Sequence, residues 1–165
     1  MAGESEDDLR FRDDRPAALL DWWRKRRAAL GHLPGRQHFD PVSIKPLLPW
    51  IFMVDVEGAG DPAGRLRFRW RLLGSELTAM AGRNATGRWF DELYPEPVYG
   101  DFVRSYVDTV SQCRAVRSVG TMAIASAARD FLPYESVKTP LATDGRTVDL
   151  ILGLVAPVAG GTTAG

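Results

Sequence analysis

An alternating pattern in residues 65–73, RLRFRWRLL, restricts the chain to folds that contain a sheet with one buried face. Successive side chains of a strand point to opposite faces of the sheet, so residues two apart in the sequence share one face. One face carries Arg67, Arg69 and Arg71, and the other carries Leu66, Phe68, Trp70 and Leu72. The second face is apolar enough to form part of a core.

Four further segments have the composition of strands. The run WIFMVDVE at 50–57 is dense in β-favouring residues, and the loop GAGDPAG at 58–64 joins it to the alternating segment as a hairpin. Three more strands are predicted in AVRSVGTMAIA (115–125), FLPYESVKTPLA (131–142) and RTVDLILGLVAPV (146–158). The turn pair Asp144-Gly145 connects the last two.

A first helix is predicted from Asp14, a candidate N-cap, to Leu30, with Gly31 as the stop signal. Apolar residues recur in it at helical spacing: Leu19, Leu20, Trp23 and Leu30. Trp22 and Trp23 are adjacent, and one narrow stripe cannot bury both. They are therefore candidate interface residues for a homodimer or another partner, and packing of both against the sheet is the alternative.

A second helix is predicted to start near Pro97 and to run to Cys113. Its apolar stripe has steps of three and four: Tyr99, Phe102, Val103, Tyr106, Val110 and Cys113. The segment VSIKPLLP at 42–49 is a short helix or an extended corner, because Pro46 and Pro49 interrupt it. Helices and strands in this order predict an α+β domain with an antiparallel sheet.

One domain is expected, from residue 15 to residue 158. A chain of 165 residues that is 45% hydrophobic can bury a single core. Residues 1–14 are acidic and have too few apolar groups to order themselves, so a disordered tail is expected there. Residues 159–165 form a Gly/Thr/Ala segment, which is expected to be a flexible tail.

Charge and cysteine content limit the partners. Lys plus Arg equals Asp plus Glu at 21 each, so no net field attracts nucleic acid or an anionic membrane surface. Cys113 is the only cysteine, which excludes an internal disulfide and a multi-cysteine metal site. No secretory leader is recognised, and a reducing cytoplasm is the expected location. The apolar runs are strand-sized, so membrane insertion is not expected.

Motifs of common enzymes are missing from the sequence. It has no Gly-x-Ser-x-Gly elbow, no Walker loop, and no His-x-x-x-His or Cys-x-x-Cys pair. Asp55 and Asp149 interrupt apolar strands. We interpret them as structural partners for the arginines at 67, 69 and 71, because neighbouring strands can bring such charges together.

Four short motifs resemble those of the PAS-domain family. They are Arg-x-x-x-Asp-Pro at 36–41, Arg-Leu-x-Gly at 71–74, Gly-x-x-x-x-Gly at 82–87 and Pro-Leu-x-x-x-Gly at 140–145. The likeness extends over residues 16–158. Within the family, the sequence is similar to a bacterial branch in which a PAS domain makes up nearly the whole protein.

The resemblance implies a five-stranded antiparallel sheet in the spatial order 2-1-5-4-3, with short helices and one longer helix on one face. A small ligand or cofactor can lie between the sheet and these helices. The stretch 72–93 would then form a wall of the pocket. Gly74, Gly82 and Gly87 would provide its bends, and Trp89 and Phe90 would cap or fill the pocket.

The sequence does not identify a cofactor. In light-sensing flavin PAS domains a cysteine forms an adduct with the flavin, and Ala85 occupies the matching position here. A photochemical adduct is therefore not expected. Haem-binding PAS domains usually use a histidine on the longer helix, and residues 97–113 contain none, so haem is not expected either.

Three functions remain open. The leading one is a non-catalytic sensory or regulatory domain that binds a small apolar or mixed ligand and signals through protein contacts. Candidate lining residues, each of which also fits plain core packing, are Trp70, Arg71 as an anion anchor, Phe90, Phe102, Tyr106, Met122, Tyr134 and Leu152. The second is a ligand-free interaction or dimerisation module. The third is an enzyme of the isomerase or hydratase type, whose base only Asp55, Asp149 or Glu135 could supply.

Overall fold

The alternating segment forms β2 (Arg67–Leu73), an edge strand of a five-stranded antiparallel sheet. The structure is a computed structural model and describes residues 9–123 and 131–158. The other strands are β1 (Ile51–Glu57), β3 (Val116–Ala123), β4 (Phe131–Leu141) and β5 (Leu150–Pro157). Their order in the sheet is β2-β1-β5-β4-β3, which confirms the fold class and the strand order that the resemblance implies.

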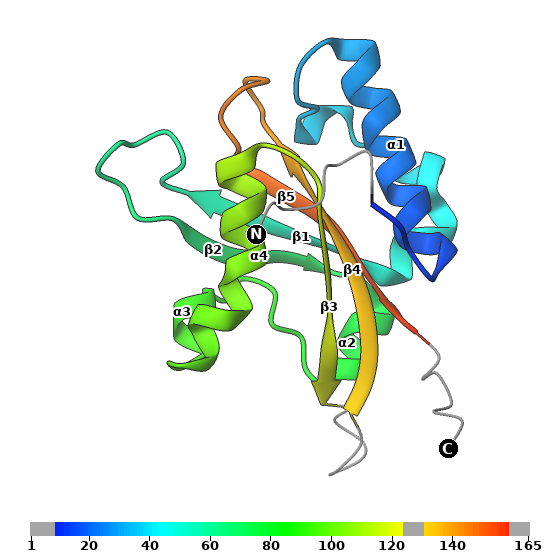
Figure 1. The fold of residues 1–165 in the computed structure, drawn as a ribbon, viewed down its shortest axis with the longest axis vertical. Coiled ribbons are helices and arrows are strands. Elements are labelled where there is room, and N and C mark those ends of the chain that lie inside the picture. Colours follow the sequence, from blue (N-terminus) through cyan, green and yellow to red (C-terminus); the bar gives the residue numbers. More distant parts are fainter. Residues whose placement is uncertain (1–8, 124–130, 159–165) are drawn as a thin grey trace.

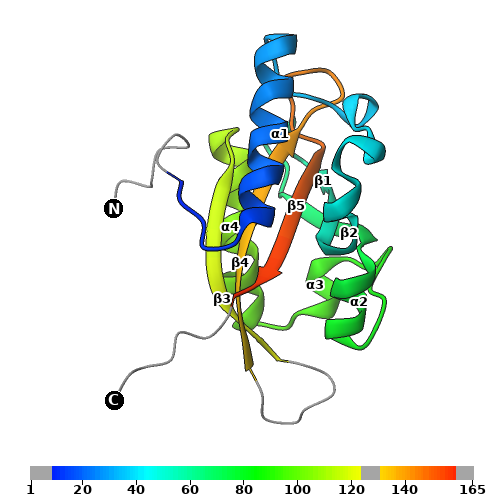
Figure 2. The same ribbon diagram turned by 90° about the vertical axis from the view of Figure 1, so that its right-hand side faces the viewer.

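Helices cover both faces of the sheet (Figure 1, Figure 2). Helix α1 (Asp14–Leu30) lies along β4 and β5 on one face, which we call the α1 face. Helix α4 (Val98–Gln112) crosses β3 and β4 on the opposite face, the α4 face, next to the short α3 (Phe90–Leu93). Within the described residues, none of the helices combines the length and the hydropathy of a membrane span.

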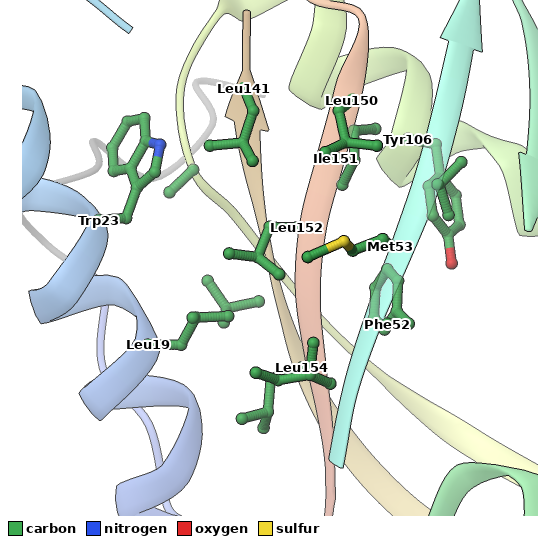
Figure 3. Packing of buried hydrophobic residues seen from close by; sticks show 14 of the residues in the cluster. Leu19, Trp23, Phe52, Met53, Tyr106, Leu141, Leu150, Ile151, Leu152 and Leu154 are labelled. Atoms are coloured by element: carbon green, nitrogen blue, oxygen red, sulfur yellow. The ribbon is translucent and has the colours of Figure 1, made fainter. Parts of the chain in front are cut away.

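Helix α1 is capped at both ends and buried along one side. Asp13, one residue before the predicted N-cap, accepts a hydrogen bond from the backbone N–H of Arg15 at 2.8 Å. Gly31 ends the helix with a φ of 75°. Leu19 and Trp23 are fully buried, and they point toward Leu152 of β5 and Leu141 of β4 (Figure 3), so the helix contributes directly to the core.

Both tryptophans of α1 are buried within the chain. The indole N–H of Trp23 donates to the carbonyl oxygen of Pro140 at 2.9 Å, and that of Trp22 donates to Ser43 Oγ at 3.1 Å. The interpretation that one stripe cannot bury both tryptophans is therefore wrong. The 3-10 helix η3 (Pro41–Trp50) packs beside α1 and widens its buried side, so the two residues lose their basis as interface candidates.

The segment before α1 is anchored to the sheet through Glu135 of β4. The backbone N–H groups of Arg12 and Asp13 both donate to the Glu135 carboxylate. Arg117 of β3 donates to the same carboxylate at 3.0 Å. Leu9 is buried as well, so the chain is packed against the sheet before the helix begins.

This anchoring corrects the expectation of a disordered tail over residues 1–14. From Leu9 onward the chain packs against the sheet, because Glu135 supplies a buried acceptor that a count of charges cannot reveal. Residues 1–8 lie outside the described residues, as does the predicted flexible tail at 159–165.

The stretch between β2 and α4 bends at glycines, as predicted. A Cβ at Gly74 would lie 2.3 Å from the carbonyl oxygen of Pro49, so no side chain fits where the chain leaves β2. The helix α2 (Ser75–Ala81) follows, and Gly82 ends it with a φ of 71°. The close passage of Gly74 holds α2 next to η3.

Two predicted burial patterns are wrong. Leu72 is 42% exposed, because an irregularity in the β1–β2 pairing between Met53 and Val54 interrupts the alternation at the end of β2. Cys113 was assigned to the buried stripe of α4 but is exposed. It follows the last helical residue with a left-handed backbone at a φ of 49°, which turns its side chain away from the stripe.

Candidate ligand-binding site

Aromatic side chains fill the space between the sheet and helices α3 and α4. Phe102 and Tyr106 come from the apolar stripe of α4, and Phe68 and Trp70 come from one face of β2. The ring centroids of Trp70 and Phe90 are 4.7 Å apart, and those of Phe90 and Tyr106 are 5.0 Å apart. The members of this aromatic cluster are Phe52, Phe68, Trp70, Phe90, Tyr94, Phe102 and Tyr106.

Three polar side chains lie next to the aromatic cluster on the α4 face: Lys138, Ser118 and Ser136, which we call the lysine–serine group. Lys138 Nζ lies 2.9 Å from Ser136 Oγ and 3.1 Å from Ser118 Oγ, and the two hydroxyl oxygens are 2.7 Å apart. Lys138 and Ser136 share a face because they are two residues apart on β4, and Ser118 of β3 pairs with Ser136.

Lys138 is a buried lysine, and its burial disfavours the charged form of the side chain. Lys138 is 4% exposed, and among the described residues no carboxylate lies within ion-pair distance of its Nζ. Desolvation lowers the pKa of Lys138 from 10.5 to about 7. The ammonium lies 4.8 Å from the ring centroid of Tyr106 and 5.9 Å from that of Phe52, contacts that favour the charged form only modestly. Charged and neutral lysine therefore coexist near neutral pH.

The tyrosines near Lys138 do not supply a negative charge. Burial raises the pKa of Tyr106 well above its ordinary value, and burial also raises the pKa of Tyr134, which shares the α4 face of β4 with Lys138. Tyr134 lies over Gly120 of β3, where a Cβ would lie 2.9 Å from its hydroxyl oxygen. Both phenols are neutral at pH 7, so the positive charge of Lys138 stays uncompensated.

The predicted lining residues are only partly brought together. Trp70, Phe90, Phe102 and Tyr106 all belong to the aromatic cluster. Tyr134 lies on the same face, beside the lysine–serine group. These five residues surround one region between the sheet and α4, and their role toward a ligand stays a prediction.

Three other predicted lining residues do not join them. Arg71 lies at the edge of the sheet, where its guanidinium pairs with Asp55 at 3.2 Å, so it cannot anchor an anion inside the domain. Leu152 points to the α1 face, toward Leu19 (Figure 3). Its orientation could not be predicted, because β5 is buried on both faces and its apolar pattern does not distinguish them. The side chain of Met122 lies outside the described part of the chain.

The three carboxylates considered as possible bases lie away from the aromatic cluster. Asp55 pairs with Arg69 at 3.0 Å as well as with Arg71, which confirms the structural ion pair predicted for it. Asp149 instead accepts a hydrogen bond from the backbone N–H of Thr143 in the β4–β5 loop. Glu135 is occupied on the α1 face by the segment before α1. The described residues therefore place no carboxylate where an isomerase or hydratase base was expected.

The lysine–serine group was missed by sequence reasoning. Its signal was present in the segment FLPYESVKTPLA, where a serine and a lysine two residues apart interrupt the apolar character of a predicted strand. The partner Ser118 is 18 residues away, and only the β3–β4 register identifies it. A lysine in a strand is normally assigned to a solvated face, and here the α4 face is closed by Tyr106.

Comparison with known proteins agrees with this architecture. Residues 13–156 match a family model described as a PAS domain. The chain belongs to the PAS-domain family. No curated protein sequence matches the PAS domain described here.

Solved structures with a similar fold include light-oxygen-voltage proteins. A light-oxygen-voltage domain studied with a flavin analogue has 13% identity and a TM-score of 0.51, over 76% of this chain and 90% of that chain. A variant of RsLOV has 12% identity and a TM-score of 0.50, over 74% of this chain and 68% of that chain. A LOV protein of Rhodobacter sphaeroides has 12% identity and a TM-score of 0.48, over 75% of this chain and 71% of that chain. At these identities the likeness to the first two structures shows the fold alone.

The residues of this PAS domain do not fit a flavin adduct. Ala85, which the sequence resemblance puts at the position of the adduct-forming cysteine, is buried and carries no thiol. Cys113 is exposed at the end of α4 and faces away from the interior. The rings of the aromatic cluster also pack against one another, with the centroids of Tyr94 and Phe102 4.2 Å apart.

Proposed function

We propose that this PAS domain is a non-catalytic sensory or regulatory domain, which binds a small ligand between the sheet and α4 and transmits the signal through protein contacts. The lysine–serine group carries the proposal. Ligand sites are mostly apolar and contain a few converging polar groups, and the α4 face has both. A buried lysine without a counter-charge costs stability, so packing alone does not account for it.

The strand β4 offers a route for the signal. It carries Lys138 on the α4 face and Glu135 on the α1 face, three residues apart. A ligand that binds one arrangement of α4 better than another shifts the population toward that arrangement. Because Glu135 holds the backbone of Arg12 and Asp13, a shift of β4 would alter the anchoring of the segment before α1. A homodimer or a partner protein in the cytoplasm would read this change.

A ligand-free interaction module is the second candidate. The mutual packing of the aromatic cluster favours it, because side chains already occupy the space between the sheet and α4. A surface hollow of about 430 Å³ lies on the other side of the molecule, between α1 and η3, with Ile44 and Leu47 in its lining. Protein contacts without a ligand would use surfaces of this kind.

Native mass spectrometry of freshly purified protein tests the proposed function. We expect a mass excess of a few hundred daltons or less per chain that disappears under denaturing conditions, because a ligand in the interior leaves only when α4 opens. The same spectrum reports the oligomeric state. A chain at its sequence mass, combined with no shift in melting temperature across a diverse library of small acids, amines and neutral compounds, would support the interaction module instead.

A further inference from the structure

We propose that the ligand of this PAS domain is a small organic anion, whose carboxylate is held by the ammonium of Lys138 and the hydroxyls of Ser118 and Ser136. The apolar body of the anion would lie against Tyr106 and its aromatic neighbours. This inference rests on the proposed function and names the ligand class of the same site.

Charge is the first reason. An ammonium buried without a counter-charge is unfavourable, and a ligand carboxylate at hydrogen-bond distance would remove most of this cost. No described carboxylate does so from within the chain, because Glu135, although only three residues away, faces the opposite side of the sheet and is bound by Arg117. A neutral ligand would leave the charge of Lys138 uncompensated.

The hydrogen-bond inventory is the second reason. A charged lysine has three N–H donors, and each serine hydroxyl adds one O–H donor. The serine oxygens accept two of the lysine donors, and one hydroxyl donates to the other. One N–H of Lys138 and one O–H therefore have no acceptor within the lysine–serine group. Two convergent donors beside a positive charge match the two oxygens of a carboxylate.

The position of the group is the third reason. Ser118 is half-buried on β3, an edge strand, so the lysine–serine group reaches the border of the sheet. Helix α4 packs over it on this face, with Tyr106 next to Lys138. An anion would enter where α4 meets β3. The aromatic rings pack against one another, so the anion would need α4 to move outward, and we expect its body to be small, such as one ring or a short alkyl chain.

Lys138 is the group whose titration would control such binding. The titratable side chains that face it are Tyr106 of α4 and Tyr134 of β4, and both keep their protons at neutral pH. The residues that face it from the other packed strands, Ser118 of β3 and Phe52 of β1, do not titrate. Carboxylate affinity should therefore fall by about tenfold for each pH unit above the pKa of Lys138, because only the charged fraction binds.

Calorimetry with matched acids and amides tests the inference. The probes are acetate, hexanoate and benzoate against acetamide, hexanamide and benzamide, at pH 6, with the wild-type protein, Lys138→Met and Lys25→Met. Lys25 is an exposed lysine on α1, so its loss changes the net charge equally without changing the interior. We expect at least one acid to bind the wild type and Lys25→Met at least about tenfold more tightly than its amide. Lys138→Met should lose this preference.

Each other outcome has a defined meaning. If an amide binds as tightly as its acid, or if Lys138→Met keeps the preference for the acid, the anion assignment is wrong while a ligand-binding function stands. If no probe binds and native mass spectrometry finds no bound molecule, the anion assignment and the proposed function both fail. Ser118→Ala provides a second check, because it should weaken acid binding severalfold and leave amide binding unchanged.

Discussion

Replacing Lys138 by methionine is expected to raise the free energy of unfolding by about 3 kcal/mol at pH 6. The lowering of the lysine pKa from 10.5 to about 7 corresponds to a cost of about 5 kcal/mol for burying the charge, at about 1.4 kcal/mol per pKa unit. Some of this gain is lost with the hydrogen bonds to Ser118 and Ser136. In a domain of this size the melting temperature should rise by about 6–12 °C.

The gain should depend on pH in a defined direction. The folded protein binds the Lys138 proton more weakly than the unfolded chain does, so wild-type stability should rise between pH 7 and pH 10.5. The advantage of Lys138→Met is therefore largest at pH 7 and below, smaller at pH 9, and absent above pH 10.5. Urea denaturation at pH 6 and pH 9 measures it, with Lys25→Met as the control. A Lys138→Met protein that is less stable than the wild type at pH 6 would contradict the burial of an uncompensated charge.

Replacing Glu135 by glutamine is expected to lower the free energy of unfolding by about 3 kcal/mol. The glutamine keeps an acceptor oxygen but leaves the guanidinium of Arg117 without its negative partner in a mostly buried position. It also weakens the two hydrogen bonds from the backbone of Arg12 and Asp13. Amide hydrogen exchange at residues 9–13 should become faster at the same time, because this carboxylate anchors the segment before α1.

Glu57→Gln is the matched control for Glu135→Gln. Glu57 is exposed at the end of β1 in the same sheet, so its substitution should change the stability by less than about 0.5 kcal/mol. Equal effects of the two substitutions, or unchanged exchange at residues 9–13 in Glu135→Gln, would show that Glu135 does not anchor this segment.

Much of the fold could be predicted because local patterns have direct structural meaning. The alternation in 65–73 identified β2. The steps of three and four in 97–113 identified Phe102 and Tyr106 as residues of the buried side of α4, and both belong to the aromatic cluster. Gly74 was predicted as a bend, and the contact with Pro49 that requires a glycine there became visible only in the structure. The strand order came from the resemblance to PAS domains, since no pattern within the strands specifies their neighbours.

The site itself was harder to predict, because its features depend on contacts across the sheet. The orientation of Leu152 could not be read from a strand that is buried on both faces. The pairing of Lys138 with Ser118 depends on the β3–β4 register, and the burial of Lys138 depends on where α4 crosses. The anchoring of Arg12 and likewise of Asp13 by Glu135 joins residues more than 120 positions apart. None of these contacts has a local sequence signature.

Titration of the lysine side chains by NMR tests the central claim, which is that Lys138 carries an uncompensated charge inside the domain. The sequence contains three lysines, Lys25, Lys45 and Lys138, so the Cε and Nζ signals can be assigned by single substitutions. We predict that one signal titrates near pH 7 and that this signal is missing in Lys138→Met. A Lys138 signal that titrates near 10.5, the ordinary pKa of a lysine, would contradict the account.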